Sequence, residues 1–291
     1  MIMTTKPNLF SSLIQGSAVL AVSLSMGLSV ASAADTINIV FEAPGAATKS
    51  IPIDNLALQG GKFSVKVPGG DLPTTPFPEA LASHVSGEKP AEIDQAVGLL
   101  LLNKPIDALA LLEPLLEKHK VSAKVPGNYW IEAARAALVA YSINRSTSKC
   151  DEIGKALSEA TPAAGDDPQV ALSRAMLTSL SVKIDDRISA LAALSNDSSP
   201  PEVSAYASYF QGNLLKTAKR NTEALEAYLT IPSVYPTGGR VINAAAGLNA
   251  AEILANMNRR DEAVTLLEDA VREGKNTVIA TEAEKKIPLI K

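Results

Sequence analysis

Residues 209–236 read YFQGNLLKTAKRNTEALEAYLTIPSVYP, and the spacing of small and aromatic residues in this stretch decides the fold. Two segments with helical periodicity flank a polar break. Gly212 on the first segment is followed twelve residues later by Ala224 on the second, and Tyr228 lies one helical turn beyond that alanine. Small residues let two antiparallel helices approach closely, and the aromatic ring fills the space beneath them. The stretch therefore predicts a helical hairpin, which Pro236 closes.

Further helical hairpins are predicted from residue 91 onwards. Apolar patterns of helical period, each 11–18 residues long, alternate there with clusters of Pro, Gly, Asn and Ser. We expect ten main helices in five pairs, and a final helix over Thr277–Lys286. The first helices of the pairs begin near Ala91, Asn128, Pro168, Glu202 and Arg240, and the second helices begin near Pro105, Lys149, Asp185, Asn221 and Arg259.

Two of these helix starts carry capping signals. Aspartates occupy positions 166–167 directly before Pro168, and serines occupy positions 198–199 before Pro200. A side-chain oxygen there accepts a hydrogen bond from the first turn, and proline lacks an N–H that would otherwise be unpaired. We expect one residue of each pair to cap its helix.

The hairpin at 209–236 resembles the tetratricopeptide repeat (TPR) family, whose pattern Gly212, Ala224, Tyr228 and Pro236 meet. The next unit matches in part, with Ala251 and Ala263 twelve residues apart. The resemblance covers residues 91–275 and implies an all-α fold, a right-handed α-solenoid of about five TPR-like hairpins. Such a solenoid has a concave groove that binds extended or helical peptides. The repeat residues are Gly212, Ala224, Tyr228, Pro236, Ala251 and Ala263.

The first helix of each TPR hairpin faces the groove, and this gives the candidate partner-binding residues. Aromatic, amide and charged side chains there would suit a partner that offers apolar side chains and backbone carbonyls. The alternative is that the tyrosines pack between repeats and the polar groups are solvated. The candidates are Tyr206, Tyr209, Asn213, Lys216, Leu248, Glu252 and Asn256.

The amino-terminal residues 1–33 are predicted to be a signal peptide. Lys6 precedes an apolar run, and Ala31-Ser32-Ala33 has the small-x-small pattern that signal peptidase accepts. Cleavage there predicts a periplasmic protein with no integral membrane span. The alternative is an inner-membrane anchor, because residues 7–34 are uncharged and long enough to cross a bilayer.

A small β segment is predicted over residues 34–70, followed by a Pro-rich linker over 71–90 and the helical repeat domain over 91–291. Alternating runs on either side of Gly60-Gly61 predict a hairpin, since a primed two-residue turn needs positive φ at both central positions. So few short strands are not stable alone. We expect the segment to cap the helical edge, with pairing to a partner strand as the alternative.

Composition excludes several classes of function. The chain has 27 basic and 31 acidic residues in 291, a net charge of −4, so nucleic-acid binding is not expected. The one cysteine, Cys150, is expected to be partly buried, and no catalytic or phosphate-loop motif occurs. Paired acids such as Asp185-Asp186 fit helix starts better than metal sites. We therefore predict no enzyme, no metal and no cofactor.

These observations predict a non-enzymatic interaction scaffold of the bacterial cell envelope. Its partner would be another envelope protein or peptide, held in the groove of the solenoid. One alternative is a membrane-tethered accessory subunit of an envelope complex. Another is a glycan- or wall-acting hydrolase, which would need an acid–base pair about 5–9 Å apart.

Overall fold

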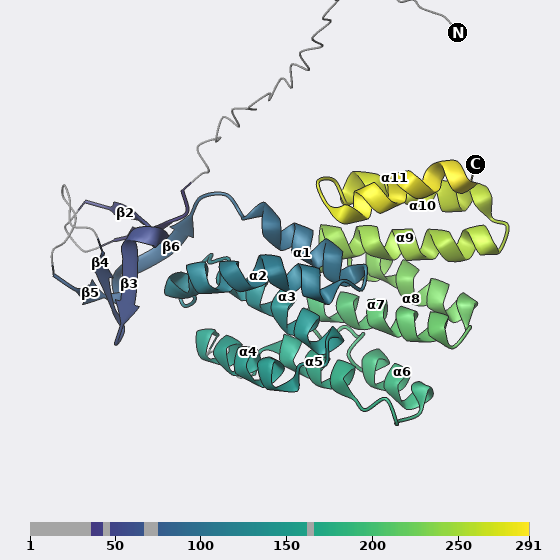
Figure 1. Ribbon diagram of the computed structural model, residues 1–291, viewed down its shortest axis with the longest axis horizontal. Coiled ribbons are helices and arrows are strands. Elements are labelled where there is room, and N and C mark those ends of the chain that lie inside the picture. Colours follow the sequence, from purple (N-terminus) through teal and green to yellow (C-terminus); the bar gives the residue numbers. More distant parts are fainter. Residues whose placement is uncertain (1–35, 43–46, 67–74, 162–165, 291) are drawn as a thin grey trace, which may run out of the picture. The chain divides into compact units, whose positions relative to one another are not determined.

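The computed structural model describes residues 36–42, 47–66, 75–161 and 166–290, which form a small β module followed by α-helices (Figure 1). The predicted signal peptide and the alternative anchor, within residues 1–34, lie outside the described residues. Across the described part, no helix is both long and apolar enough to cross a membrane.

In its described residues, the β module consists of short antiparallel strands in two three-stranded sheets. Gly60 and Gly61, with φ of 56° and 70°, form the predicted turn of the hairpin in the second sheet. The first sheet has the order β2-β1-β6, with β1 Asn38–Phe41, β2 Lys49–Pro52 and β6 Ala82–Ser86. The second has the order β3-β4-β5, with β3 Leu56–Gln59, β4 Lys62–Val65 and β5 Phe77–Pro78.

The predicted linker over 71–90 is wrong for residues 75–90, because β5 and β6 lie there. Strand β6 pairs with β1, which precedes it by about forty residues, and such a distant partner leaves no local sequence pattern. The module also bonds to the segment that leads into α3. Val85 N–H donates to the Pro126 carbonyl at 2.9 Å, and Tyr129 Oη donates to the Gly87 carbonyl at 2.6 Å.

The helical region has eleven α-helices among the described residues, and consecutive helices pack as pairs, as predicted. The predicted final helix extends four residues further than expected. The helices are α1 Ala91–Leu101, α2 Pro105–His119, α3 Trp130–Ile143, α4 Thr147–Ala160, α5 Pro168–Leu177, α6 Ile184–Ala192, α7 Pro201–Thr217, α8 Asn221–Val234, α9 Arg240–Asn256, α10 Arg260–Glu273 and α11 Val278–Ile290.

Four of these helix pairs share one turn geometry. The residue that follows the C-cap of the first helix has a left-handed φ between 57° and 61°. The next N–H donates at 2.9 Å to the carbonyl five residues earlier, which closes the helix as a Schellman motif. The left-handed residues are Asn103, Arg145, Lys219 and Asn258.

One of the two capping predictions is confirmed. Asp167 Oδ1 accepts from the N–H of Gln169 at 2.9 Å and caps α5. Among the residues that the structure describes, however, no side chain caps α7, so the prediction for Ser198 or Ser199 is wrong. Their N–H groups instead donate to Asn196 Oδ1 at 2.8 and 3.2 Å, which holds both serines in the turn before the helix.

Helix α1 contacts the last helices as well as its neighbours. It packs against α3, α9 and α11 in addition to α2, and one continuous cluster of buried apolar residues extends from α1 to α11. Asp94 of α1 pairs with Arg240 of α9, and Gln95 donates to the Asn276 carbonyl before α11. This differs from the predicted open stack, in which each hairpin would contact only its neighbours.

Candidate functional site

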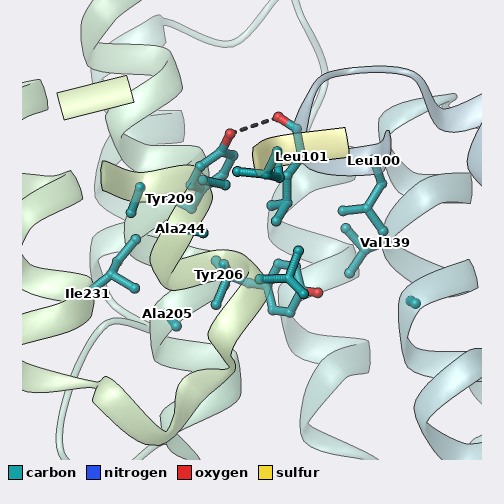
Figure 2. Close-up of a cluster of buried hydrophobic side chains, with 14 of the residues drawn as sticks. Leu100, Leu101, Val139, Ala205, Tyr206, Tyr209, Ile231 and Ala244 are labelled. Carbon is teal, nitrogen blue, oxygen red and sulfur yellow. Dashed lines mark hydrogen bonds between the residues drawn. The ribbon is translucent and has the colours of Figure 1, made fainter. Parts of the chain in front are cut away.

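The predicted groove face is buried against the chain's own first helix. Tyr206 and Tyr209 of α7 are 5% and 1% exposed, and Leu248 of α9 is 2% exposed. Figure 2 shows both tyrosines in the apolar cluster with Leu100 and Leu101 of α1. Burial raises the pKa of each tyrosine hydroxyl. The expectation that these three side chains contact a partner is therefore corrected: they belong to the core.

Tyr209 also joins three helices through its hydroxyl. The hydroxyl donates to the Leu101 carbonyl at 2.7 Å (Figure 2). It also accepts from Asn249 Nδ2 at 2.9 Å. A buried hydroxyl that both donates and accepts satisfies a free carbonyl at the end of α1. Tyr209 thus positions α1 against α7 and α9.

The polar members of the predicted groove set form a partly exposed belt between helices. Lys216 Nζ of α7 lies 2.6 Å from Glu252 Oε2 of α9, and Lys286 Nζ of α11 lies 2.8 Å from the other oxygen of that carboxylate. Burial alone would raise the pKa of Glu252, but the hydrogen bonds from both lysines outweigh it and hold the pKa below its usual value. Asn256 is exposed at the end of α9.

The repeat residues lie between paired helices. A Cβ placed on Gly212 would lie 2.7 Å from the ring of Tyr228, so only glycine fits beside that ring. The Tyr228 hydroxyl donates to Asn213 Oδ1 at 2.6 Å, which places another residue of the predicted groove set within a hairpin. The remaining repeat residues are Ala224, Ala251 and Ala263, all buried, and Pro236, which is exposed.

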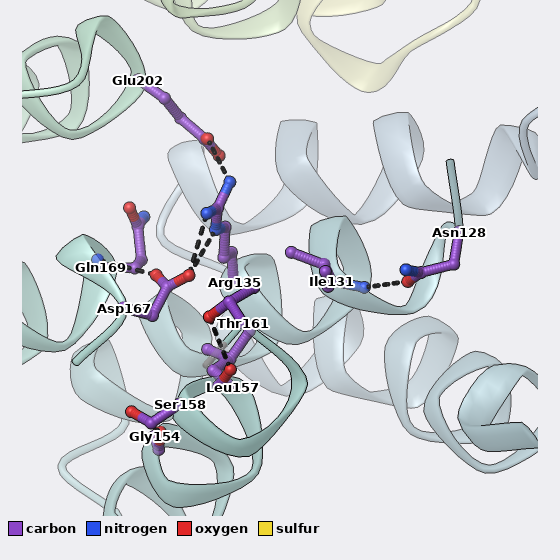
Figure 3. Close-up of polar contacts among 10 residues, drawn as sticks. All are labelled: Asn128, Ile131, Arg135, Gly154, Leu157, Ser158, Thr161, Asp167, Gln169 and Glu202. Atoms are coloured by element: carbon purple, nitrogen blue, oxygen red, sulfur yellow. Dashed lines mark hydrogen bonds and ion pairs between the residues drawn. The ribbon is translucent and has the colours of Figure 1, made fainter. Parts of the chain in front are cut away.

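A charged cluster forms around Arg135 of α3 (Figure 3). Its acidic members lie at the amino-terminal ends of α5 and α7. Arg135 donates from Nε and Nη2 to Asp167 Oδ2 at 3.1 and 2.9 Å, and from Nη1 to Glu202 Oε2 at 3.2 Å. Asp167 is 1% exposed, so its charge is compensated by Arg135 and by the first turn of α5. Nearby, Lys89 pairs with Asp94 and Glu132.

A cleft of about 550 Å³ opens beside this cluster. Its walls include Glu132, Arg135 and Glu202 together with the loop over residues 123–128. Burial raises the pKa of the Glu202 carboxyl, and the nearby charges of Glu132 and Asp167 raise it further. The ion pair with Arg135 lowers the pKa but does not outweigh these effects. The cleft therefore contains two carboxylates, one of which has a raised pKa. No sequence motif predicted this cleft.

A larger groove of about 820 Å³ lies between the β module and the helices α2 and α4. Apolar side chains of β3 line one wall. Pro114, Ala156 and Ala160 line the helical side, with Trp130 also in the lining. Trp130 is 5% exposed and belongs to the buried apolar cluster of the helices. The charged residues of the lining are Asp54, Lys66, Glu117, Lys118, Lys120, Lys124 and Glu159.

Two further side chains, those of Cys150 and His119, are buried. Cys150 is buried, with its sulfur 3.6 Å from Ser142 Oγ. His119 is 2% exposed, and burial lowers its pKa, with the neighbouring Lys118 adding to this. Within the described ranges, no group of His, Cys, Asp and Glu is arranged to hold a metal ion.

Comparisons of the chain with protein-family models, with curated proteins and with solved structures found no match. The fold itself defines an array of paired α-helices with a small β module before it.

Proposed function

We propose that this protein is a non-enzymatic interaction scaffold of the bacterial cell envelope that binds a partner polypeptide. The observation that carries the proposal is the 820 Å³ groove between the β module and α2–α4. It combines apolar walls with charged side chains at its rim, which is the usual composition of a polypeptide-binding surface. The buried face at Tyr206 and Tyr209 is not the proposed site, because α1 covers it.

We further propose that the helix pairs are TPR-like units wound in a right-handed sense. The close approach of Gly212 to Tyr228 and the turn shared by four helix pairs support this relationship. The contact of α1 with α9 and α11 distinguishes the array from an open solenoid, and it moves the proposed binding surface from the concave face to the β module.

The proposed location is the periplasm, after cleavage of residues 1–33. The alternative is an accessory subunit that stays tethered to the inner membrane through residues 7–34. Amino-terminal sequencing of the protein from membrane and periplasmic fractions separates the two. A chain that begins at Ala34 excludes tethering by this segment, and an intact amino terminus in the membrane fraction supports it.

The test of the scaffold function is site-specific photo-crosslinking in the native cell. A photo-reactive amino acid replaces Ala57 or Glu159 in the groove, and, as a matched control, exposed Thr265 of α10. We expect both groove positions to capture the same polypeptide and Thr265 not to capture it. Capture from all three positions alike, or no capture from the groove, would contradict the proposal.

A second candidate, a hydrolase acting on wall glycan, is favoured by one observation. Glu132 and Glu202 both line the 550 Å³ cleft, and the pKa of Glu202 is raised, as a general acid requires. Release of soluble fragments from purified cell wall measures this activity. Activity lost in Glu202→Gln and in Glu132→Gln would support the hydrolase, and an inactive wild-type protein would exclude it.

A further inference from the structure

The edge strands of the β module differ in how they are protected. Edge strands expose unpaired backbone groups, and proteins block them with proline, charge or covering segments. Strands β2 and β5 contain Pro52 and Pro78. The edge of β6 is bonded to a loop, since Val85 N–H donates to the Pro126 carbonyl. Strand β3, Leu-Ala-Leu-Gln, has neither proline nor charge.

The register of the hairpin determines which backbone groups of β3 face outward. In a two-residue hairpin the residues flanking the turn, Gln59 and Lys62, form a hydrogen-bonded pair, and the pattern then alternates. The N–H and C=O of Leu58 and the C=O of Leu56 therefore point away from β4. The Leu56 N–H already donates to the Ile53 carbonyl. The outer edge of β3 thus offers a donor and two acceptors to a further strand.

The 820 Å³ groove lies beside this edge. Its lining includes Leu56, Ala57 and Leu58 of β3, together with Val121, which packs against the apolar cluster of the β module, and Ala160 of α4. The four residues of β3 span about 13 Å at about 3.3 Å per residue, which matches a short extended segment. The apolar walls can accept alternate side chains of that segment.

The charge of the rim indicates which segment fits. Four lysines and three acidic residues line the groove, whereas the whole chain has a net charge of −4. Lys118 Nζ lies 3.3 Å from Asp54 Oδ2, so this ion pair compensates part of the charge within the protein. Within the described part of the chain, Lys120 and Lys124 pair with no acidic side chain. Acidic groups on a bound segment would pair with these two lysines.

We infer that the outer edge of β3 accepts an extended segment of the partner polypeptide as an added strand, and that this segment carries acidic side chains. The inference rests on the proposed scaffold function and specifies how the groove would be occupied. Backbone hydrogen bonds to Leu56 and Leu58 supply affinity, and Lys120 and Lys124 select acidic side chains.

The test uses two ten-residue probes, an alternating Val–Glu peptide and its Val–Lys counterpart, titrated into the purified isotope-labelled protein. We expect the Val–Glu peptide to shift the Leu58 amide resonance, to protect that amide from hydrogen exchange, and to bind at least tenfold more tightly than the Val–Lys peptide. Equal binding of the two peptides, shifts confined to other regions, or no binding of the Val–Glu peptide at millimolar concentration would overturn the inference.

Matched variants separate backbone pairing from side-chain packing. Leu58→Pro removes the outward N–H, whereas Leu58→Ala shortens the side chain and keeps that donor. We expect loss of Val–Glu binding in Leu58→Pro, retention in Leu58→Ala, and at least tenfold weakening when Lys120 and Lys124 are both changed to Glu. Binding that survives Leu58→Pro would contradict strand addition.

The same variants distinguish this inference from the scaffold function. If Leu58→Pro still captures the polypeptide crosslinked from Ala57, the scaffold function stands and strand addition is wrong. If the wild-type protein binds the peptide but captures no polypeptide in cells, the scaffold function fails. Sedimentation of the purified protein tests whether a second copy of the chain occupies the groove. A dimer that is lost in Leu58→Pro would show that β3 pairs with β3 of a second copy, and this would overturn the inference of an acidic partner.

Discussion

Gly212 and the Tyr228 ring occupy a space that admits no further carbon atom, since an added Cβ would lie 2.7 Å from the ring. The ring is fully buried, so it cannot move into solvent. We expect Gly212→Ala to lower the free energy of unfolding by about 1–3 kcal/mol, as overpacking in a core does. Urea unfolding followed by circular dichroism measures the change.

Gly247 of α9 is the matched control for this substitution. A Cβ there would lie 3.4 Å from the Leu266 carbonyl oxygen, an ordinary contact. Alanine is better than glycine in a helix by about 1 kcal/mol, so Gly247→Ala should leave stability unchanged or raise it. Equal effects of the two substitutions would show that Gly212 is not constrained by Tyr228.

Glu252 should make folding depend on pH. Burial opposes ionisation, but Lys216 and Lys286 hold the pKa of Glu252 below its unfolded value of about 4.3. The ionised carboxylate thus stabilises the fold above pH 4.3, and this contribution is lost as pH falls through the lower folded pKa. We expect Glu252→Gln to lower the free energy of unfolding at pH 7 by about 1 kcal/mol or less. Urea unfolding at pH 7 and at pH 3.5 measures this contribution. The variant should lose less stability than the wild type when the pH is lowered from 7 to 3.5.

Glu202 should make the free energy of unfolding depend on pH in the opposite direction. Burial, supported by nearby acidic groups, raises its pKa, so ionisation costs stability as pH rises through the region above the unfolded pKa. Glu202→Gln should therefore gain more stability than the wild type between pH 4 and pH 7. A parallel response of the Glu202 and Glu252 variants would contradict these pKa directions.

At the scale of elements, local signals in the sequence predict the helices well. Each of the ten main helices begins within two residues of its predicted start. Proline and polar residues at these starts act through the first turn itself, as Asp167 does in capping α5. The predicted hairpin at Gly60-Gly61 is also confirmed, because turn chemistry is local.

The missed features depend on contacts between distant parts of the chain. Strand β6 forms only through pairing with β1, and the burial of Tyr206 and Tyr209 depends on α1, more than one hundred residues earlier. The groove beside β3 combines residues from the β module and from helices α2, α3 and α4. Periodicity identifies the apolar face of α7 but cannot tell which element covers it.

The pair of α5 and α6 should be the least protected part of the helical array. Helix α6 has two buried residues, Ile188 and Leu191, whereas α9 has eleven. Local opening follows the amount of buried apolar contact. We expect amides of α6 to exchange at least tenfold faster than those of α9, measured by hydrogen exchange and mass spectrometry. Equal protection of the two helices would contradict this difference.

At the scale of the molecule, the packing of α1 decides where a partner can bind. Helix α1 fills the face that an open TPR-like stack would present, and Asp94, Gln95 and Leu101 bond it to later elements. The β module before α1 then becomes part of the surface beside α2 and α4. The proposed groove therefore follows from the closure of the helical array.

An engineered disulfide between α1 and the residue before α11 tests this closure most directly. A Cβ on Gly98 would lie 3.5 Å from Cβ of Thr277, within the range of natural disulfides. In a Cys150→Ala background, Gly98→Cys with Thr277→Cys should crosslink within the monomer upon oxidation, as shown by peptide mass spectrometry. Gly98→Cys paired with Thr265→Cys on α10 is the control and should stay reduced. A folded protein in which no disulfide forms between the cysteines at 98 and 277 would contradict the closed array.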